Sequence, residues 1–143
     1  MKKVLPLKMP WLTHMTKYQI DTNALLRFLI NDVPTESKMV KEFFRSAKSH
    51  KLEAEICEPV FIETLIVLRN YYKYPKDKTL ILLQSIIALD WLTIENFPVL
   101  TTALDLYSQS DLDFVDCLIL ARSKTKQQKI FTFDSKLSKV FSI

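Results

Sequence analysis

Two spacings of apolar residues recur along the chain, and they predict helices and strands in alternation. Residues 34–50 carry apolar side chains such as Val40, Phe43 and Ala47 at helical spacing. Residues 52–57 alternate apolar and acidic positions, which is typical of a strand. The same reading predicts strands at residues 17–20, 52–57, 91–96 and 129–134, and helices at residues 24–30, 34–50, 59–73, 75–90, 97–110, 113–127 and 135–141.

Strands separated by helices favour parallel pairing, because each connection must cross over the sheet. We therefore expect an α/β fold, a three-layer α/β/α sandwich with a central parallel sheet, over residues 17–143. Residues 1–16 fall outside the pattern. Residues 1–16 are expected to form a poorly ordered leader, or else residues 1–14 precede a true start at Met15. In parallel sheets of this kind, ligands bind at the carboxyl ends of the strands.

Composition argues against several classes of protein. The absence of glycine from 143 residues disfavours Walker A, dinucleotide-binding and EF-hand loops, which need glycine for close backbone approach or positive φ. Two cysteines and two histidines supply no zinc-binding cluster. No apolar stretch is long enough to span a bilayer, and the first residues lack the apolar core of a signal peptide. We therefore expect a cytoplasmic protein with no membrane partner.

The formal net charge of +4 is carried by the first residues of the chain. The lysines that precede the first acid, Asp21, account for the whole excess: Lys2, Lys3, Lys8 and Lys17. The rest of the chain holds equal numbers of acidic and basic side chains. Net charge is therefore weak support for a nucleic-acid partner.

Acidic residues recur where the ligand-binding edge of the predicted sheet would lie. Asp21 and Asp134 each end a predicted strand, and Asp21 is followed by Thr22 or Asn23 as the expected cap of the helix at residues 24–30. Three further acids lie in the first turns of predicted helices: Glu63, Asp113 and Asp116. Helix capping and the helix dipole can explain each aspartate singly. Glu63 is harder to explain, because its sequence neighbours are apolar and a lone buried carboxylate is costly.

Carboxylates gathered at one edge repel one another, and no lysine or arginine is expected among them as a counter-charge. Mg²⁺ or Mn²⁺ meets this need, because hard divalent cations prefer carboxylate oxygens. In "DLDFVDC", residues 111–117, Asp113 and Asp116 lie one helical turn apart and are both candidate ligands. Asp111 is expected to point elsewhere, as part of the preceding loop. The pattern predicts a metal site of the kind that serves phosphoryl chemistry.

The sequence resembles the PIN-domain ribonucleases, specifically the VapC toxins of toxin–antitoxin pairs. The resemblance covers about residues 18–141 and is carried by four motifs in order: "IDTNALLRFLINDVP", "EPVFIETLIVLRNYY", "DFVDCLILARS" and "FTFDSKLSKV". It implies a PIN-like fold, an RNA substrate, a cognate VapB-type antitoxin and a homodimer. The implied activity is that of an endoribonuclease that uses Mg²⁺ or Mn²⁺ and leaves a 5′-phosphate and a 3′-hydroxyl.

The resemblance also assigns the site. The family's catalytic, metal-binding acids fall on Asp21, Glu63, Asp116 and Asp134, with Asp113 as a secondary ligand. The polar residues that orient these carboxylates in the family match Asn23 and Thr132.

An acidic site needs nearby bases to hold RNA, and the candidates are Arg27, Arg122 and Lys124. Bases near a helix C-terminus also complement the helix dipole, which is the simpler explanation for the last two. Two other classes stay open. One is a catalytically silent PIN-fold module that binds RNA or protein. The other is a receiver-type phosphoacceptor domain, although Glu63 on a helix and the "DFVD" motif do not fit its pattern.

Overall fold

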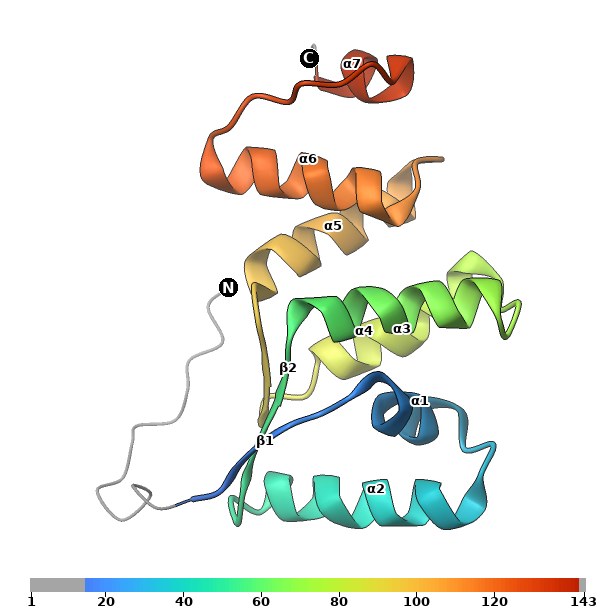
Figure 1. Ribbon diagram of the computed structural model, residues 1–143, viewed down its shortest axis with the longest axis vertical. Helices are drawn as coiled ribbons and strands as arrows, with labels where there is room; N and C mark the ends of the chain where they lie inside the picture. The colour runs from blue at the N-terminus through green and yellow to red at the C-terminus, as the bar shows by residue number, and fades with distance from the viewer. Residues whose placement is uncertain (1–14, 142–143) are drawn as a thin grey trace. The chain divides into compact units, whose positions relative to one another are not determined.

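The computed structural model describes residues 15–141, which belong to two compact units, Met1–Glu95 and Asn96–Ile143 (Figure 1). The expected leader thus lies, but for its last two residues, outside the described residues. The N-terminal unit contains β1 (Lys17–Gln19), α1 (Thr22–Ile30), α2 (Pro34–Lys48), β2 (Glu53–Ile56), α3 (Glu58–Asn70), α4 (Lys76–Ile87) and β3 (Leu92–Ile94). The C-terminal unit contains α5 (Phe97–Gln109), α6 (Phe114–Lys126) and α7 (Ser135–Phe141).

The described strands form a parallel sheet of order β1-β2-β3 in the N-terminal unit. Tyr18 of β1 is the register partner of Ala54 in β2, and Ala54 is in turn the partner of Leu92 in β3. The strands are consecutive in the chain but separated by helices, as parallel pairing requires. The predicted α/β class is therefore confirmed: a parallel sheet with flanking helices.

The core of the N-terminal unit is built from apolar side chains of its helices and of β2 and β3. Its fully buried side chains include Leu25 of α1, Ile56 of β2, Phe61 and Leu68 of α3, and Leu83 of α4. Complete burial of such a side chain stabilises a fold by about 1.5–3 kcal/mol. α3 therefore contributes its apolar face to this core.

Helix ends in this chain adopt left-handed backbone without glycine. Asn31, His50, Lys73, Asn96 and Gln127 have φ between 53° and 59°. Asn31 is the C-cap of α1, where its backbone N–H donates to the carbonyl of Arg27 at 3.3 Å. Asparagine tolerates this conformation better than most residues, so it is a natural substitute for the missing glycine.

In the C-terminal unit, α5 packs against α6. The rings of Tyr107 and Phe114 meet edge to face with centroids 5.6 Å apart, and Cys117 and Leu120 of α6 are buried. None of the helices in the described part of the chain is both long and apolar enough to cross a membrane.

The prediction of a strand at residues 129–134 is wrong. These residues form an irregular segment between α6 and α7. Phe131 and Phe133 alternate as they would in a strand, but both are more than 90% exposed and their rings contact each other, with centroids 5.4 Å apart. Alternation describes one strand, whereas a sheet also needs a partner ladder that local sequence does not specify.

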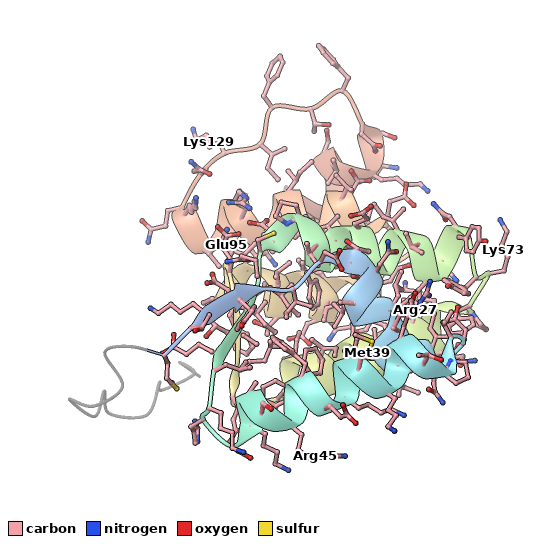
Figure 2. The ribbon with its side chains drawn as sticks, turned by 60° about the horizontal axis from the view of Figure 1, so that its bottom comes forward. Arg27, Met39, Arg45, Lys73, Glu95 and Lys129 are labelled. Carbon is pink, nitrogen blue, oxygen red and sulfur yellow. The ribbon has the colours of Figure 1, made fainter. Side chains whose placement is uncertain are left out.

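Helix α2 has one buried face and one exposed face. Ser37, Phe44 and Ala47 are buried against the rest of the unit. Arg45, one residue beyond Phe44, projects from the helix away from the ribbon (Figure 2). The exposed side of this helix therefore presents charged groups to solvent.

Candidate active site

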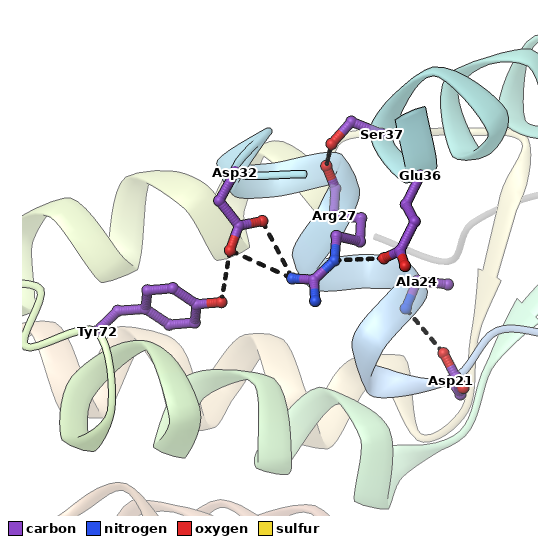
Figure 3. A network of polar contacts seen from close by, with 7 residues as sticks. All are labelled: Asp21, Ala24, Arg27, Asp32, Glu36, Ser37 and Tyr72. Carbon is purple, nitrogen blue, oxygen red and sulfur yellow. Dashed lines mark hydrogen bonds and ion pairs between the residues drawn. The ribbon is translucent and has the colours of Figure 1, made fainter. Parts of the chain in front are cut away.

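Asp21 lies between β1, which ends at Gln19, and α1, which begins at Thr22. The backbone N–H of the preceding Ile20 still donates to Glu55 of β2, at 2.8 Å. The Oδ1 atom of Asp21 then accepts from the N–H of Ala24 at 2.8 Å, which makes Asp21 the N-cap of α1 (Figure 3). The expectation that Thr22 or Asn23 caps this helix is wrong. The Oδ2 atom of Asp21 has no hydrogen-bond partner among residues 15–141, so it is available to a ligand.

Glu63 is oriented by a residue that sequence reasoning missed. Its side chain is exposed on α3, so the expectation of an apolar environment is wrong: the buried face of α3 carries Phe61, Thr64 and Leu65 instead. The hydroxyl of Thr22 donates to Glu63 Oε2 at 2.6 Å. That distance is typical of an O–H group bound to a carboxylate. Thr22 directly follows Asp21, which is the only signal in the sequence that could have pointed to it.

Asn23 lies in the first turn of α1 and is exposed. Its orienting role, implied by the resemblance, stays a prediction.

The C-terminal unit has its own acidic pocket, with a volume of about 450 Å³. Its carboxylates are Asp111, Asp113, Asp116 and Asp134, and the remaining lining residues are Phe133, Ser135 and Lys136. Asp113 and Asp116 share the pocket as expected from their spacing of one helical turn. The expectation that Asp111 points elsewhere is wrong, because the turn before α6 brings it to the same pocket.

Asp116 is the least exposed carboxylate of this pocket. It is half-buried in the first turn of α6, and burial raises its pKa, as do the charges of Asp134 and Asp113. Lys136 acts in the opposite direction. No group among residues 15–141 forms a hydrogen bond with the Asp116 carboxylate. A cation bound here would relieve both the burial cost and the repulsion.

Asp134 caps α7 and is itself held by Thr132. Asp134 Oδ1 accepts from the backbone N–H of Lys136 at 2.7 Å and of Leu137 at 3.3 Å. Thr132 Oγ1 accepts from the backbone N–H of Asp134 at 3.0 Å. Thr132 therefore holds the backbone of Asp134, while Oδ2 of this aspartate has no hydrogen-bond partner in the described part of the chain.

Lys136 is a second residue that sequence reasoning missed. The expectation that no base lies among the acids is wrong: Lys136 is two residues beyond Asp134 and lines the pocket with it. One cation among four aspartates lowers their mutual repulsion without cancelling it. The pocket therefore keeps a net negative charge.

Arg27 already has acidic partners (Figure 3). Its Nε donates to Glu36 at 2.6 Å and its Nη1 to Asp32 at 3.0 Å, and Asp32 also accepts from the Tyr72 hydroxyl at 2.9 Å. The bond to Glu36 is the main cause that raises the pKa of Arg27. These contacts tie the end of α1 to α2 and to the residues after α3. An RNA-binding role for Arg27 stays a prediction.

The other two candidate RNA contacts belong to α6. Arg122 is half-buried, whereas Lys124 is exposed in the last turn. Their position fits the helix dipole as well as it fits RNA, so their role also stays a prediction.

The chemistry of the donors suits a hard divalent cation. Asp21, Glu63 and Asp134 each use one carboxylate oxygen within the protein and keep the other free among the described residues. Such oxygen-only donors are those that Mg²⁺ and Mn²⁺ prefer. Within residues 15–141, no group of three or more His, Cys, Asp or Glu side chains is arranged to hold a metal ion.

The fold is a parallel α/β domain whose candidate carboxylates lie after a strand and in helices. Comparison with known families identifies the class of protein to which it belongs. The PIN domain family model matches residues 18–141, so the chain belongs to the PIN domain family. The chain is also similar to a VapC ribonuclease of Aquifex aeolicus (strain VF5). The two are 26% identical over 105 residues, which cover 73% of this chain and 77% of the relative. No solved structure matches the chain significantly.

Membership of the PIN domain family confirms the resemblance seen in the sequence and the PIN-like fold class. It also argues against the receiver-type domain, because the family match covers the whole of the described domain.

Proposed function

We propose that this protein is a metal-dependent endoribonuclease and the toxin of a toxin–antitoxin pair. The observation that carries the proposal is the set of partly free carboxylates, Asp21 and Glu63 in one unit and Asp116 and Asp134 in the other. Membership of the PIN domain family and similarity to a VapC ribonuclease support it.

In this proposal the four carboxylates hold Mg²⁺ or Mn²⁺, with Asp113 as a secondary ligand. When bound, the cation neutralises charge on the phosphoryl oxygens and activates water. Thr22 fixes the direction of Glu63, and the N-cap bond fixes Asp21. Both contacts reduce the rotational freedom that each carboxylate would lose on binding.

The proposed reaction is hydrolysis of an RNA phosphodiester. The oxygen of water forms a bond to phosphorus, and the bond between phosphorus and the 3′-oxygen breaks. One carboxylate of the site accepts the proton of the attacking water, and the departing 3′-oxygen takes up a proton from solvent water. The products are a 5′-phosphate and a 3′-hydroxyl. Lys136 offers a cation to a phosphate oxygen at the rim of the pocket.

The proposal includes partners and location. A cognate VapB-type antitoxin would block the acidic site, and the toxin would act as a homodimer in the cytoplasm, where its RNA substrate is found. Co-expression with the product of an adjacent small gene, followed by size-exclusion chromatography, tests the antitoxin and the dimer together.

Incubation of the purified protein with labelled RNA tests the activity. The expected result is cleavage with Mn²⁺ or Mg²⁺, none with EDTA, and fragments that carry 5′-phosphates. Binding of RNA without cleavage under any metal condition would instead identify a catalytically silent PIN-fold module. Matched DNA of the same sequence is the control for substrate class.

A further inference from the structure

One side of α2 carries a row of cations that the candidate active site does not use. We call the four exposed residues Lys38, Lys41, Arg45 and Lys48 the basic stripe. At 100° per residue they fall within about 80° of the helix circumference. At a rise of 1.5 Å per residue they extend over about 15 Å of its length. Arg45 projects outward from the helix in Figure 2.

Ion pairing within the chain does not explain the basic stripe. Two other cations of the same unit do have carboxylate partners: Arg27 binds Asp32 and Glu36, and Lys17 lies 3.5 Å from Glu53. In the described part of the chain, none of the four stripe residues has a carboxylate within 4.0 Å. Four like charges therefore lie side by side without an ion pair inside the described part of the chain.

The helix dipole explains only half of the basic stripe. Arg45 and Lys48 lie in the last turn of α2, where a cation is stabilised. Lys38 lies near the start of the helix and Lys41 at its centre, where the dipole gives no such benefit. Water solvates these exposed cations, so the row is open to an external anion.

The stripe also borders a concave surface. Lys38, Lys41 and Arg45 line a groove of about 240 Å³ together with Asn31, Pro34 and Glu42. Three cations and one carboxylate leave the groove with a net positive charge. A concave surface of one sign concentrates the opposite charge more strongly than a flat one.

We propose that the basic stripe binds the phosphate backbone of RNA and so holds the substrate outside the acidic site. The identity of the polyanion rests on the function proposed above. Because aspartates repel a phosphodiester, much of the affinity for RNA must come from another surface. α2 packs on α1, the helix whose N-cap is Asp21. The centroids of the Phe28 and Phe44 rings lie 4.7 Å apart, and the Ser37 hydroxyl donates to the Arg27 carbonyl at 2.8 Å.

The test is the salt dependence of RNA binding. Fluorescence anisotropy with a labelled single-stranded RNA of about 12 nucleotides would be measured in an Asp21→Asn background, which prevents cleavage. The slope of log K against log salt is negative, and each lost phosphate contact reduces its magnitude by about 0.7. The double variant Lys41→Gln/Arg45→Gln should therefore bind RNA more weakly, and the magnitude of its slope should be smaller by about 1.4. The matched control, Lys73→Gln/Lys78→Gln, removes the same charge from exposed positions outside the stripe and should leave the slope unchanged.

An unchanged slope in the stripe variant, or an equal decrease in the control, would overturn the inference. Stripe-dependent binding of polyglutamate with the affinity of RNA would also overturn it, in favour of an acidic protein partner. Failure of this inference can be distinguished from failure of the proposed function. Stripe-dependent RNA binding by a parent chain that never cleaves RNA would refute the nuclease alone, and cleavage with an unchanged slope would refute the stripe alone.

Discussion

The bond between Thr22 and Glu63 gives the sharpest single-residue prediction. Replacing Thr22 by Val removes the hydroxyl but keeps the volume and the branched Cβ, so α1 should form as before. The lost bond has an O···O distance of 2.6 Å and a charged acceptor. Such bonds contribute about 1.5–3 kcal/mol when well shielded. Because Glu63 is exposed, we expect about 1 kcal/mol here.

That free energy should appear in metal binding. A carboxylate that must first be oriented binds its ion more weakly, and about 1 kcal/mol corresponds to about a fivefold loss of affinity. Isothermal titration with Mn²⁺ measures the affinity directly, and RNA cleavage at subsaturating Mn²⁺ should fall in the same proportion. At saturating Mn²⁺ the rate should recover, which a general folding defect would not allow.

Two control variants test whether the effect is specific to the hydroxyl of Thr22. Thr22→Ser keeps the hydroxyl and should retain most of the affinity. Thr35→Val makes the same replacement in the first turn of α2, at an exposed residue, and should change nothing. If Thr22→Val bound Mn²⁺ as tightly as the parent chain, the orienting role of Thr22 would be refuted.

Four further predictions follow from the structure. In EDTA at neutral pH, Asp116→Asn should raise the midpoint of thermal unfolding. The pKa of Asp116 is raised in the folded protein, so its ionised carboxylate destabilises the native state above that pKa. The difference in unfolding midpoint between variant and parent should therefore vanish as the pH falls through the pKa of Asp116. Lys136→Gln should raise KM for RNA about threefold with little change in kcat, in steady-state assays, because one exposed cation is lost from the pocket rim. Arg27→Gln should lower the unfolding midpoint by a few degrees in calorimetry, because it leaves Asp32 and Glu36 without their shared cation. Leu83→Ala should cost about 2–5 kcal/mol in urea unfolding, because Leu83 is fully buried.

Local sequence predicted most elements because their signals are local. Helix periodicity and proline at a first or second helical position located α2 and α3, and alternation located β2. The segment at residues 129–134 shows the limit. Phe131 and Phe133 alternate correctly, yet the structure forms no strand there, because pairing depends on a partner that alternation does not specify.

The acids of the candidate site could be chosen from sequence, but their environments could not. Glu63 looked buried among apolar neighbours, whereas the helix turns its side chain outward to Thr22. Asp111 looked like a loop residue, whereas the turn before α6 brings it into the pocket with Lys136. Side-chain direction depends on the phase of each helix and turn, and small errors in that phase change which groups meet.

The central claim is that the carboxylates serve a metal that cleaves RNA, and Asp21→Asn tests it most directly. Asparagine caps helices as well as aspartate does, so the bond to the Ala24 N–H and the fold should survive. Only the negative charge and its free oxygen are lost. We predict that, with Mn²⁺ and an unchanged unfolding midpoint, the initial rate of RNA cleavage falls about 100-fold or more. Equal rates for the parent chain and Asp21→Asn would contradict the account.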